Sequence, residues 1–143
     1  MRNYIKTTAG FLLSATMATT SFGATVNVGE LQGFTGPLES MIGPMSGGAN
    51  LAVTEANASG NYLQGTINVV QGDSVCIDAA VAIAEAERLI NDESVMAIMG
   101  PNCSGNTGAV ITNVLVPNGV VAISPSATSP ASVSYTHLRA HET

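Results

Sequence analysis

Basic residues are scarce in this sequence, and their scarcity excludes several kinds of partner. The 143 residues contain four Lys and Arg against ten Asp and Glu. Between residues 24 and 132 the one basic residue is Arg88. A surface with a single cation cannot neutralise a row of phosphates or a layer of anionic headgroups. Nucleic acids and anionic lipid surfaces are therefore poor partners for this chain.

Histidine and lysine are absent from the same central region. Without them a Ser–His or Cys–His nucleophile pair cannot form, and neither can a histidine-based metal site. Nine acidic residues remain there, so the formal net charge is near −8. Catalysis by carboxylates alone stays open, but these acids fall mostly on predicted helix surfaces, where solvated side chains are the simpler interpretation. We expect no enzyme, no cofactor and no metal.

A long apolar run is also missing, although a membrane-spanning helix needs about 20 such residues. The run over residues 9–18 is shorter and contains Ser and Thr. Basic residues precede it, and small residues including Gly23 follow it, which is the pattern of an export signal. We predict a signal peptide over residues 1–23 and hence a periplasmic protein. The alternative is a buried first helix.

The last eleven residues, 133–143, differ sharply from what precedes them and hold both histidines of the chain. Their sequence resembles the translation of a sequencing adapter, so we expect a non-native tail and give it no function. The alternative is a genuine polar tail. Residues 24–132 have the length of a single lobe. We expect them to form part of the N-terminal ligand-binding lobe of a longer protein.

Strand-like and helix-like segments alternate along this lobe. Helical spacing marks residues 45–58 and 77–91, a further helix is expected after the turn 100–105 through about residue 115, and β-leaning runs occupy 25–31, 66–70, 95–99 and 120–123. The run 95–99 is continuously apolar, as is typical of a strand covered on both faces. The alternation predicts an α/β fold with a mostly parallel sheet and right-handed crossovers. Ligands bind such sheets at the carboxyl ends of the strands, where the loops 32–42, 100–107 and 124–130 lie.

Two cysteines, Cys76 and Cys103, are present. In an exported protein an even pair favours a disulfide, although two buried free thiols are the alternative. The bond would close a loop of 28 residues. Chain entropy alone would then stabilise the fold by about 3.6 kcal/mol.

The loop after the third predicted strand suits a small anion. A strand, a glycine-containing turn and a helix N-terminus together present backbone N–H groups to solvent. Gly100 and Gly105 are spaced as in a phosphate loop, but Asn106 stands where that motif needs lysine. A carboxylate is therefore favoured, with Ser104 adding its hydroxyl. The alternative is that Ser104 only caps its own helix.

The loop after the fourth predicted strand suits an ammonium group. Pro125 and Pro130 stiffen it and so hold its polar groups in place before binding. Ser126 and Thr128 lie between the prolines and offer hydroxyl and carbonyl oxygens. Turns rich in Ser and Pro are common, so this loop is informative only beside its neighbour. Together the two loops predict a zwitterionic ligand, an amino acid.

Several short segments share their order and spacing with a known family; they are 35–37, 48–53, 72–76, 80–90, 100–105 and 123–128. In these segments the chain resembles the leucine/isoleucine/valine-binding proteins, the substrate-binding components of branched-chain amino-acid ABC transporters. The resemblance implies the first lobe of a two-lobed, type I periplasmic-binding fold. It also implies an inner-membrane ABC permease as partner.

The same resemblance implies a site. Cys76 and Cys103 would form the family's disulfide, and Ser104 and Thr128 would hold the ligand carboxylate. The Ser126 carbonyl and the Thr128 hydroxyl would accept from the ammonium group. Gly105 and Ala127 complete the expected ligand-binding set.

Two other functions remain open from the sequence. A sensor or receptor could use the same lobe without transport, and an α/β enzyme would need catalytic residues from outside this chain. Closure of a second lobe completes the contacts in two-lobed binding proteins. We therefore expect residues 24–132 alone to bind their ligand weakly or not at all.

Overall fold

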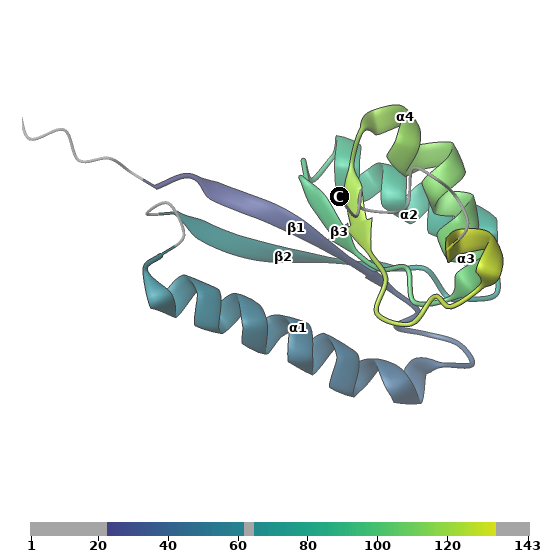
Figure 1. Ribbon diagram of the computed structural model, residues 1–143, viewed down its shortest axis with the longest axis horizontal. Coiled ribbons are helices and arrows are strands. Elements are labelled where there is room, and N and C mark those ends of the chain that lie inside the picture. Colours follow the sequence, from purple (N-terminus) through teal and green to yellow (C-terminus); the bar gives the residue numbers. More distant parts are fainter. Residues whose placement is uncertain (1–22, 62–64, 134–143) are drawn as a thin grey trace, which may run out of the picture.

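The computed structural model describes residues 23–61 and 65–133 (Figure 1). The predicted signal peptide and the predicted tail therefore lie almost entirely outside the described residues. Within these ranges no helix combines the length and apolar character that crossing a bilayer requires.

Four parallel strands and the helices between them form the described fold. The strands, in the spatial order β2-β1-β3-β4, are β1 (Thr25–Gln32), β2 (Thr66–Asp73), β3 (Ala97–Met99) and β4 (Val121–Ile123). The helices are α1 (Glu39–Ser59), α2 (Ala79–Asn91), α3 (Ser104–Val110), the π-helical η1 (Ile111–Leu115), α4 (Val116–Asn118) and α5 (Pro130–Val133). The predicted α/β class and parallel sheet are confirmed.

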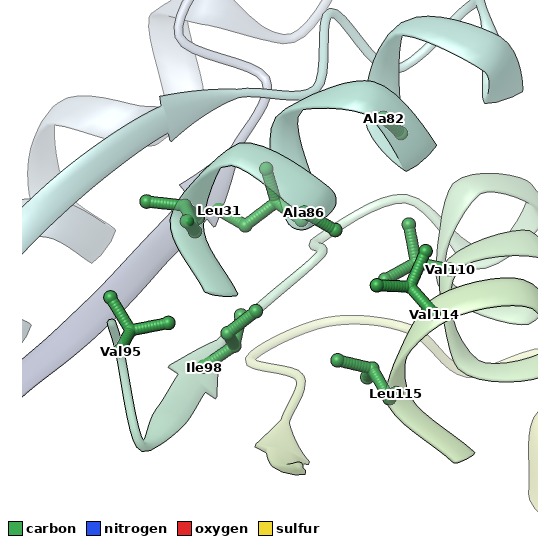
Figure 2. Close-up of a cluster of buried hydrophobic side chains, with 9 residues drawn as sticks. Leu31, Ala82, Ala86, Val95, Ile98, Val110, Val114 and Leu115 are labelled. Atoms are coloured by element: carbon green, nitrogen blue, oxygen red, sulfur yellow. The ribbon is translucent and has the colours of Figure 1, made fainter. Parts of the chain in front are cut away.

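Right-handed crossovers place the helices on opposite faces of the sheet. Helix α1 connects β1 to β2 and lies along these two strands. Helices α2 and α3 lie in the connections from β2 to β3 and from β3 to β4, which cross the sheet in the opposite direction, and they lie on the opposite face (Figure 1). The main core forms on the α2 side, where side chains from β1, α2, β3, α3 and η1 point toward one another (Figure 2). Leu31, Leu89 and Ile98 are almost fully buried there. Each such side chain contributes about 1.5–3 kcal/mol by leaving water.

Helix α1 begins at Glu39, six residues before the predicted start at residue 45. The predicted loop 32–42 is consequently shorter and spans residues 33–38. Pro44 and neighbouring glycines argue locally against a helix. However, Ile42 is 3% exposed because it packs into the fold from this first part of the helix. Tertiary packing thus overrides the local preference, and α1 ends at the predicted place with Gly60 in the left-handed conformation.

The other strand and helix boundaries also shift. β2 continues through Gly72 and Asp73, beyond the predicted end at residue 70, because β1 runs beside it as far as the Gln32–Asp73 pair. β3 is shorter than predicted; Ile98 is buried, whereas Ala97 and Met99 on its other face are half-buried. The helix predicted after residue 105 begins at Ser104 and runs on through η1 and α4 to Asn118, where Gly119 adopts a left-handed conformation.

Candidate ligand-binding site

The loops after β3 and β4 meet at the carboxyl ends of the strands. The hydroxyl oxygen of Ser104 accepts hydrogen bonds from the backbone N–H groups of Thr128 (3.2 Å) and Ser129 (3.3 Å). Ser104 lies 24 residues before Thr128 in sequence, so this contact comes from the fold and not from local chain geometry. The structure thus brings together the two residues on which the predicted zwitterion site depends.

These hydrogen bonds determine what Ser104 can still offer a ligand. A serine hydroxyl has two acceptor positions and one donor. Two backbone N–H groups take the acceptor positions, so the O–H remains as a donor, which is what a carboxylate requires. The alternative that Ser104 caps its own helix is wrong, because Cys103 occupies the N-cap position and Ser104 is the first helical residue.

The N-terminus of α3 lies beside this hydroxyl. Cys103 makes no side-chain capping hydrogen bond, since its sulfur is bonded to Cys76. The first bond inside the helix runs from the Thr107 N–H to the Cys103 carbonyl (2.8 Å), so the N–H groups of residues 104–106 have no partner within the helix. Gly105 is exposed, and a Cβ there would meet nothing within 4 Å. These donors and the helix dipole favour a small anion.

The loop after β4 is fastened to the loop after β3. The Ser126 hydroxyl donates to the Asn102 carbonyl (2.8 Å), which leaves its oxygen as an acceptor. The Ser124 hydroxyl donates to the Pro101 carbonyl and accepts from the Ala127 N–H at 2.9 Å. Thr128 is exposed at the end of this loop. Ser126 and Thr128, which offer hydroxyl and carbonyl oxygens, therefore lie on the same segment whose backbone N–H groups reach Ser104.

A basic side chain at the site would change this assignment, but among residues 23–61 and 65–133 none lies there. In the described part of the chain the one Lys or Arg side chain is Arg88, and it lies on α2. Its guanidinium contacts Glu85 and Glu93 at 3.0 Å each and donates to the Gln71 carbonyl at 2.8 Å. The hydrogen bond that Arg88 donates to Glu85, more than any other interaction, raises the pKa of Arg88. An anion at the loops would therefore be held by neutral dipoles.

A disulfide joins Cys76 to Cys103, with the two Cα atoms 5.5 Å apart, so the alternative of two free thiols is wrong. It ties the segment after β2 to the start of α3. Asn106 strengthens this link by donating to the Ser74 carbonyl at 2.7 Å. Asn102 extends it to the loop after β1, because its side-chain oxygen accepts from the Gly33 N–H at 2.9 Å. The loops at this edge of the sheet thus form one cross-linked unit.

The loop after β1 is held by Asp73 at the end of β2. The carboxylate accepts from the Thr35 hydroxyl (2.6 Å) and from the Val75 N–H (2.9 Å). Burial raises the pKa of Asp73, but the hydrogen bonds from Thr35, Val75 and the Phe34 N–H outweigh it, so that the pKa is lowered overall. The ionised carboxylate is therefore the form that fits this loop.

Sequence reasoning missed several of these residues. Asn102, Asn106 and Ser124 lie inside the predicted loops, but their role depends on partners far along the chain and no spacing marks it. Glu30 lies in a predicted strand and received no predicted role; it is 1% exposed within β1. It is buried because the side-chain amides of Gln32 (2.8 Å) and Gln71 (3.1 Å) donate to its two oxygens.

Comparison with known proteins places this geometry in a family. Residues 25–143 match the family model described as periplasmic binding protein. The Leu/Ile/Val-binding protein homolog 7 of Brucella abortus is 40% identical over 86 residues, which cover 60% of this chain and 21% of that protein.

Two solved structures have the same fold over most of the described chain. The branched-chain amino acid transporter substrate-binding protein of Streptococcus pneumoniae, in complex with isoleucine, is 35% identical with a TM-score of 0.68 and covers 74% of this chain and 30% of its own. A solute-binding protein of an ABC transporter from R. palustris, in complex with 4-hydroxybenzoate, is 27% identical with a TM-score of 0.64 and covers 73% and 28%.

The chain therefore spans less than a third of the length of these relatives. Its parallel sheet corresponds to part of one lobe of their two-lobed fold. With the family model matched over residues 25–143, the chain belongs to the periplasmic binding protein family.

Proposed function

We propose that the full-length protein binds a small amino acid, branched-chain or similar, in the periplasm and delivers it to an inner-membrane ABC permease. The relatives support this class of function, since the S. pneumoniae protein is a transporter component in complex with isoleucine and the B. abortus protein is a Leu/Ile/Val-binding homologue. A solute-binding role also agrees with the absence of His and Lys between residues 24 and 132.

The observation that carries the proposal is the position of the Ser104 hydroxyl. It accepts from the loop after β4 and keeps its hydrogen for a ligand, at the N-terminus of α3. In our proposal this hydroxyl and the Gly105 N–H donate to the ligand carboxylate, together with the Thr128 hydroxyl. Several neutral donors aimed at one carboxylate can replace a salt bridge, because hydrogen bonds to a charged group are stronger than neutral ones.

The ammonium group of the ligand is assigned to the loop after β4. The Ser126 hydroxyl donates its hydrogen bond to the Asn102 carbonyl, so the Ser126 hydroxyl oxygen can only accept from a ligand. We place the ammonium group between Ser126 and Thr128, where the hydroxyl or carbonyl oxygen of Ser126 accepts from it. Ala127 lies between these two residues in the chain. Isoleucine and 4-hydroxybenzoate, the ligands of the two solved relatives, share a carboxylate, but only isoleucine has an ammonium group. The ammonium group therefore distinguishes the two ligand classes.

A calorimetric titration of the full-length protein tests the ligand class. Leucine, isoleucine and valine are compared with 4-methyl-2-oxopentanoate, in which an oxygen replaces the ammonium group of leucine, and with 4-hydroxybenzoate. We expect the 2-oxo acid to bind at least about tenfold more weakly than leucine, a difference of about 1.4 kcal/mol. Equal or tighter binding of either acid lacking the ammonium group would reject an amino-acid site in favour of a carboxylate site.

A further inference from the structure

The strand order places a topological switch point between β1 and β3. The chain leaves β1 through α1 on one face of the sheet, whereas it leaves β3 through α3 on the opposite face (Figure 1). The loops at the carboxyl ends of these two adjacent strands therefore diverge. Open parallel sheets bind small molecules at such a point. A side chain that lies between the two loops is thus placed to touch a ligand.

The Asn102 side chain connects these two loops. It belongs to the loop after β3, and its Oδ1 accepts from the Gly33 N–H in the loop after β1 at 2.9 Å. The loops are closely packed here, since a Cβ on Gly33 would lie 2.8 Å from the Cys76 sulfur. Asn102 is 4% exposed, so both packing and this hydrogen bond hold its amide in one orientation.

The amide nitrogen of Asn102 has no acceptor. A side-chain amide carries one accepting oxygen and two N–H donors, and the bond from the Gly33 N–H identifies the oxygen. Within residues 23–61 and 65–133, Nδ2 of Asn102 donates to nothing. The enclosed polar side-chain atoms without a partner in those ranges are Gln32 Oε1 and Ser74 Oγ. Nδ2 is therefore not enclosed, and it keeps contact with solvent.

The other buried amide side chains of the described chain use their nitrogens. Gln32 donates to the Glu30 carboxylate at 2.8 Å, and Asn106 donates to the Ser74 carbonyl at 2.7 Å. Both bonds join parts of the fold to one another. Asn102 differs, because only its oxygen is used within the fold and its donor remains for a molecule from outside.

The strand order also indicates which part of a ligand this donor would meet. β3 lies between β1 and β4, so the loop after β3 has the loop after β1 on one side and the loop after β4 on the other. In the proposed amino-acid site the carboxylate lies at the start of α3. The ammonium group lies toward Ser126 and Thr128, on the β4 side. The side chain of the ligand is then directed toward β1, where the Asn102 amide lies.

Closure of a two-lobed protein removes water from the ligand. An amide N–H enclosed against an aliphatic side chain would lose its water and gain no partner, which is unfavourable. An oxygen on the ligand side chain would satisfy it. A site that hydrogen-bonds a polar group discriminates strongly against an analogue that lacks this group.

We propose that Asn102 determines specificity, and that it favours amino acids whose side chain carries a hydroxyl or carbonyl oxygen over purely aliphatic ones. This inference rests on the proposed function and narrows its substrate class. The Asn102 donor is oriented before binding, because Gly33 holds the oxygen of the same amide.

Calorimetric titration of the full-length protein with two pairs of similarly shaped amino acids tests the proposal. Threonine is compared with valine, and asparagine with leucine; each pair differs chiefly in whether the side chain carries an oxygen. We expect the polar member of at least one pair to bind at least about tenfold more tightly than its aliphatic counterpart. Absence of such a preference in both pairs, with amino acids still bound, would overturn the inference but not the proposed function. Binding of no amino acid would overturn both.

Two substitutions then assign the preference to Asn102. Asn102→Leu removes the donor and the acceptor, whereas Asn102→Asp keeps an acceptor for the Gly33 N–H and removes only the donor. In each variant that folds we expect the two members of the pair to bind within about threefold of each other. A purely structural role would weaken both members equally and leave their ratio unchanged, which would contradict the proposal. Asn113→Leu, at an exposed position of η1, is the control and should keep the preference.

Discussion

Gly100 shows how far a single residue can determine the site. Its φ of +119° lies in a region that side chains rarely adopt, and a Cβ there would collide with the Leu31 carbonyl oxygen of β1. The residue begins the loop that leads to Ser104. The close approach of two backbone segments therefore requires glycine at this position.

We expect Gly100→Ala to destabilise the full-length protein by about 2 kcal/mol or more, since it combines an unfavourable φ with a backbone collision. Gly108 in α3 is the matched control, because a Cβ there meets nothing within 4 Å. Gly108→Ala should be neutral or stabilise by up to about 1 kcal/mol, the usual gain in a helix interior. Urea unfolding followed by circular dichroism measures both. Similar unfolding midpoints for the two variants would contradict this explanation.

At the scale of residues, the sequence predicted that Ser104 and Thr128 are neighbours, but not the hydrogen bonds that Ser104 makes. Ser104 and Thr128 were expected to be neighbours because the ends of adjacent parallel strands meet, and they are. The assignment of the Ser104 acceptor positions to Thr128 and Ser129 was not predictable, since it depends on the path of the loop after β4. The burial of Glu30 was not predictable from its residue type, because its position in a strand decides its exposure.

Among the elements, the short loop between β1 and α1 depends on one carboxylate. Asp73 accepts from the Thr35 hydroxyl and from backbone N–H groups, and its pKa is lowered in the folded state. A lowered folded-state pKa means that the unfolded chain binds the proton more tightly. The carboxylate therefore stabilises the fold above about pH 4, the ordinary aspartate value. That stabilisation is lost as the pH falls through the folded-state pKa.

We expect Asp73→Asn to lower the melting temperature at pH 7 and to flatten its dependence on pH below about 4. Melting curves of the full-length protein between pH 7 and pH 2 test this, with Asp92→Asn, at the exposed end of α2, as the control. Parallel pH profiles for Asp73→Asn and the unsubstituted protein would show that the loop does not depend on this carboxylate.

The elements themselves were predictable in order and type but not in their ends. Alternating strand and helix patterns gave the parallel sheet. The start of α1 was missed because Pro44 disfavours a helix locally, whereas the burial of Ile42 favours one. The end of β2 was missed because Gly72 reads as a turn, although the neighbouring β1 extends the pairing to Asp73.

For the whole molecule, the largest departure from expectation is the exposure of β3 and β4. The continuous apolar run at residues 95–99 predicted a strand covered on both faces, yet Met96 is 69% exposed and Ala97 and Met99 are half-buried, while in β4 Val121 and Ile123 are exposed. A sequence pattern shows that a residue is suited to burial but not which segment buries it. The predicted signal peptide over residues 1–23 and the non-native tail over 133–143 stay predictions.

In the function that we propose, two loops act as one site. Ser104 accepts from Thr128 and Ser129, while Asn102 links the same region to Ser126 and to Gly33. Under this proposal the lobe supplies one wall of the binding cleft, and closure of the second lobe completes it. Removal of the Ser104 hydroxyl should therefore weaken ligand binding while leaving the sheet intact.

Calorimetric titration of full-length Ser104→Ala with the best-binding amino acid tests whether this hydroxyl holds the ligand carboxylate. We expect a 10- to 100-fold weaker affinity, about 1.5–3 kcal/mol for a hydrogen bond to a charged group. Ser59→Ala, at the far exposed end of α1, should bind as the unsubstituted protein does. Unchanged affinity in Ser104→Ala would contradict the assignment of this hydroxyl to the ligand carboxylate.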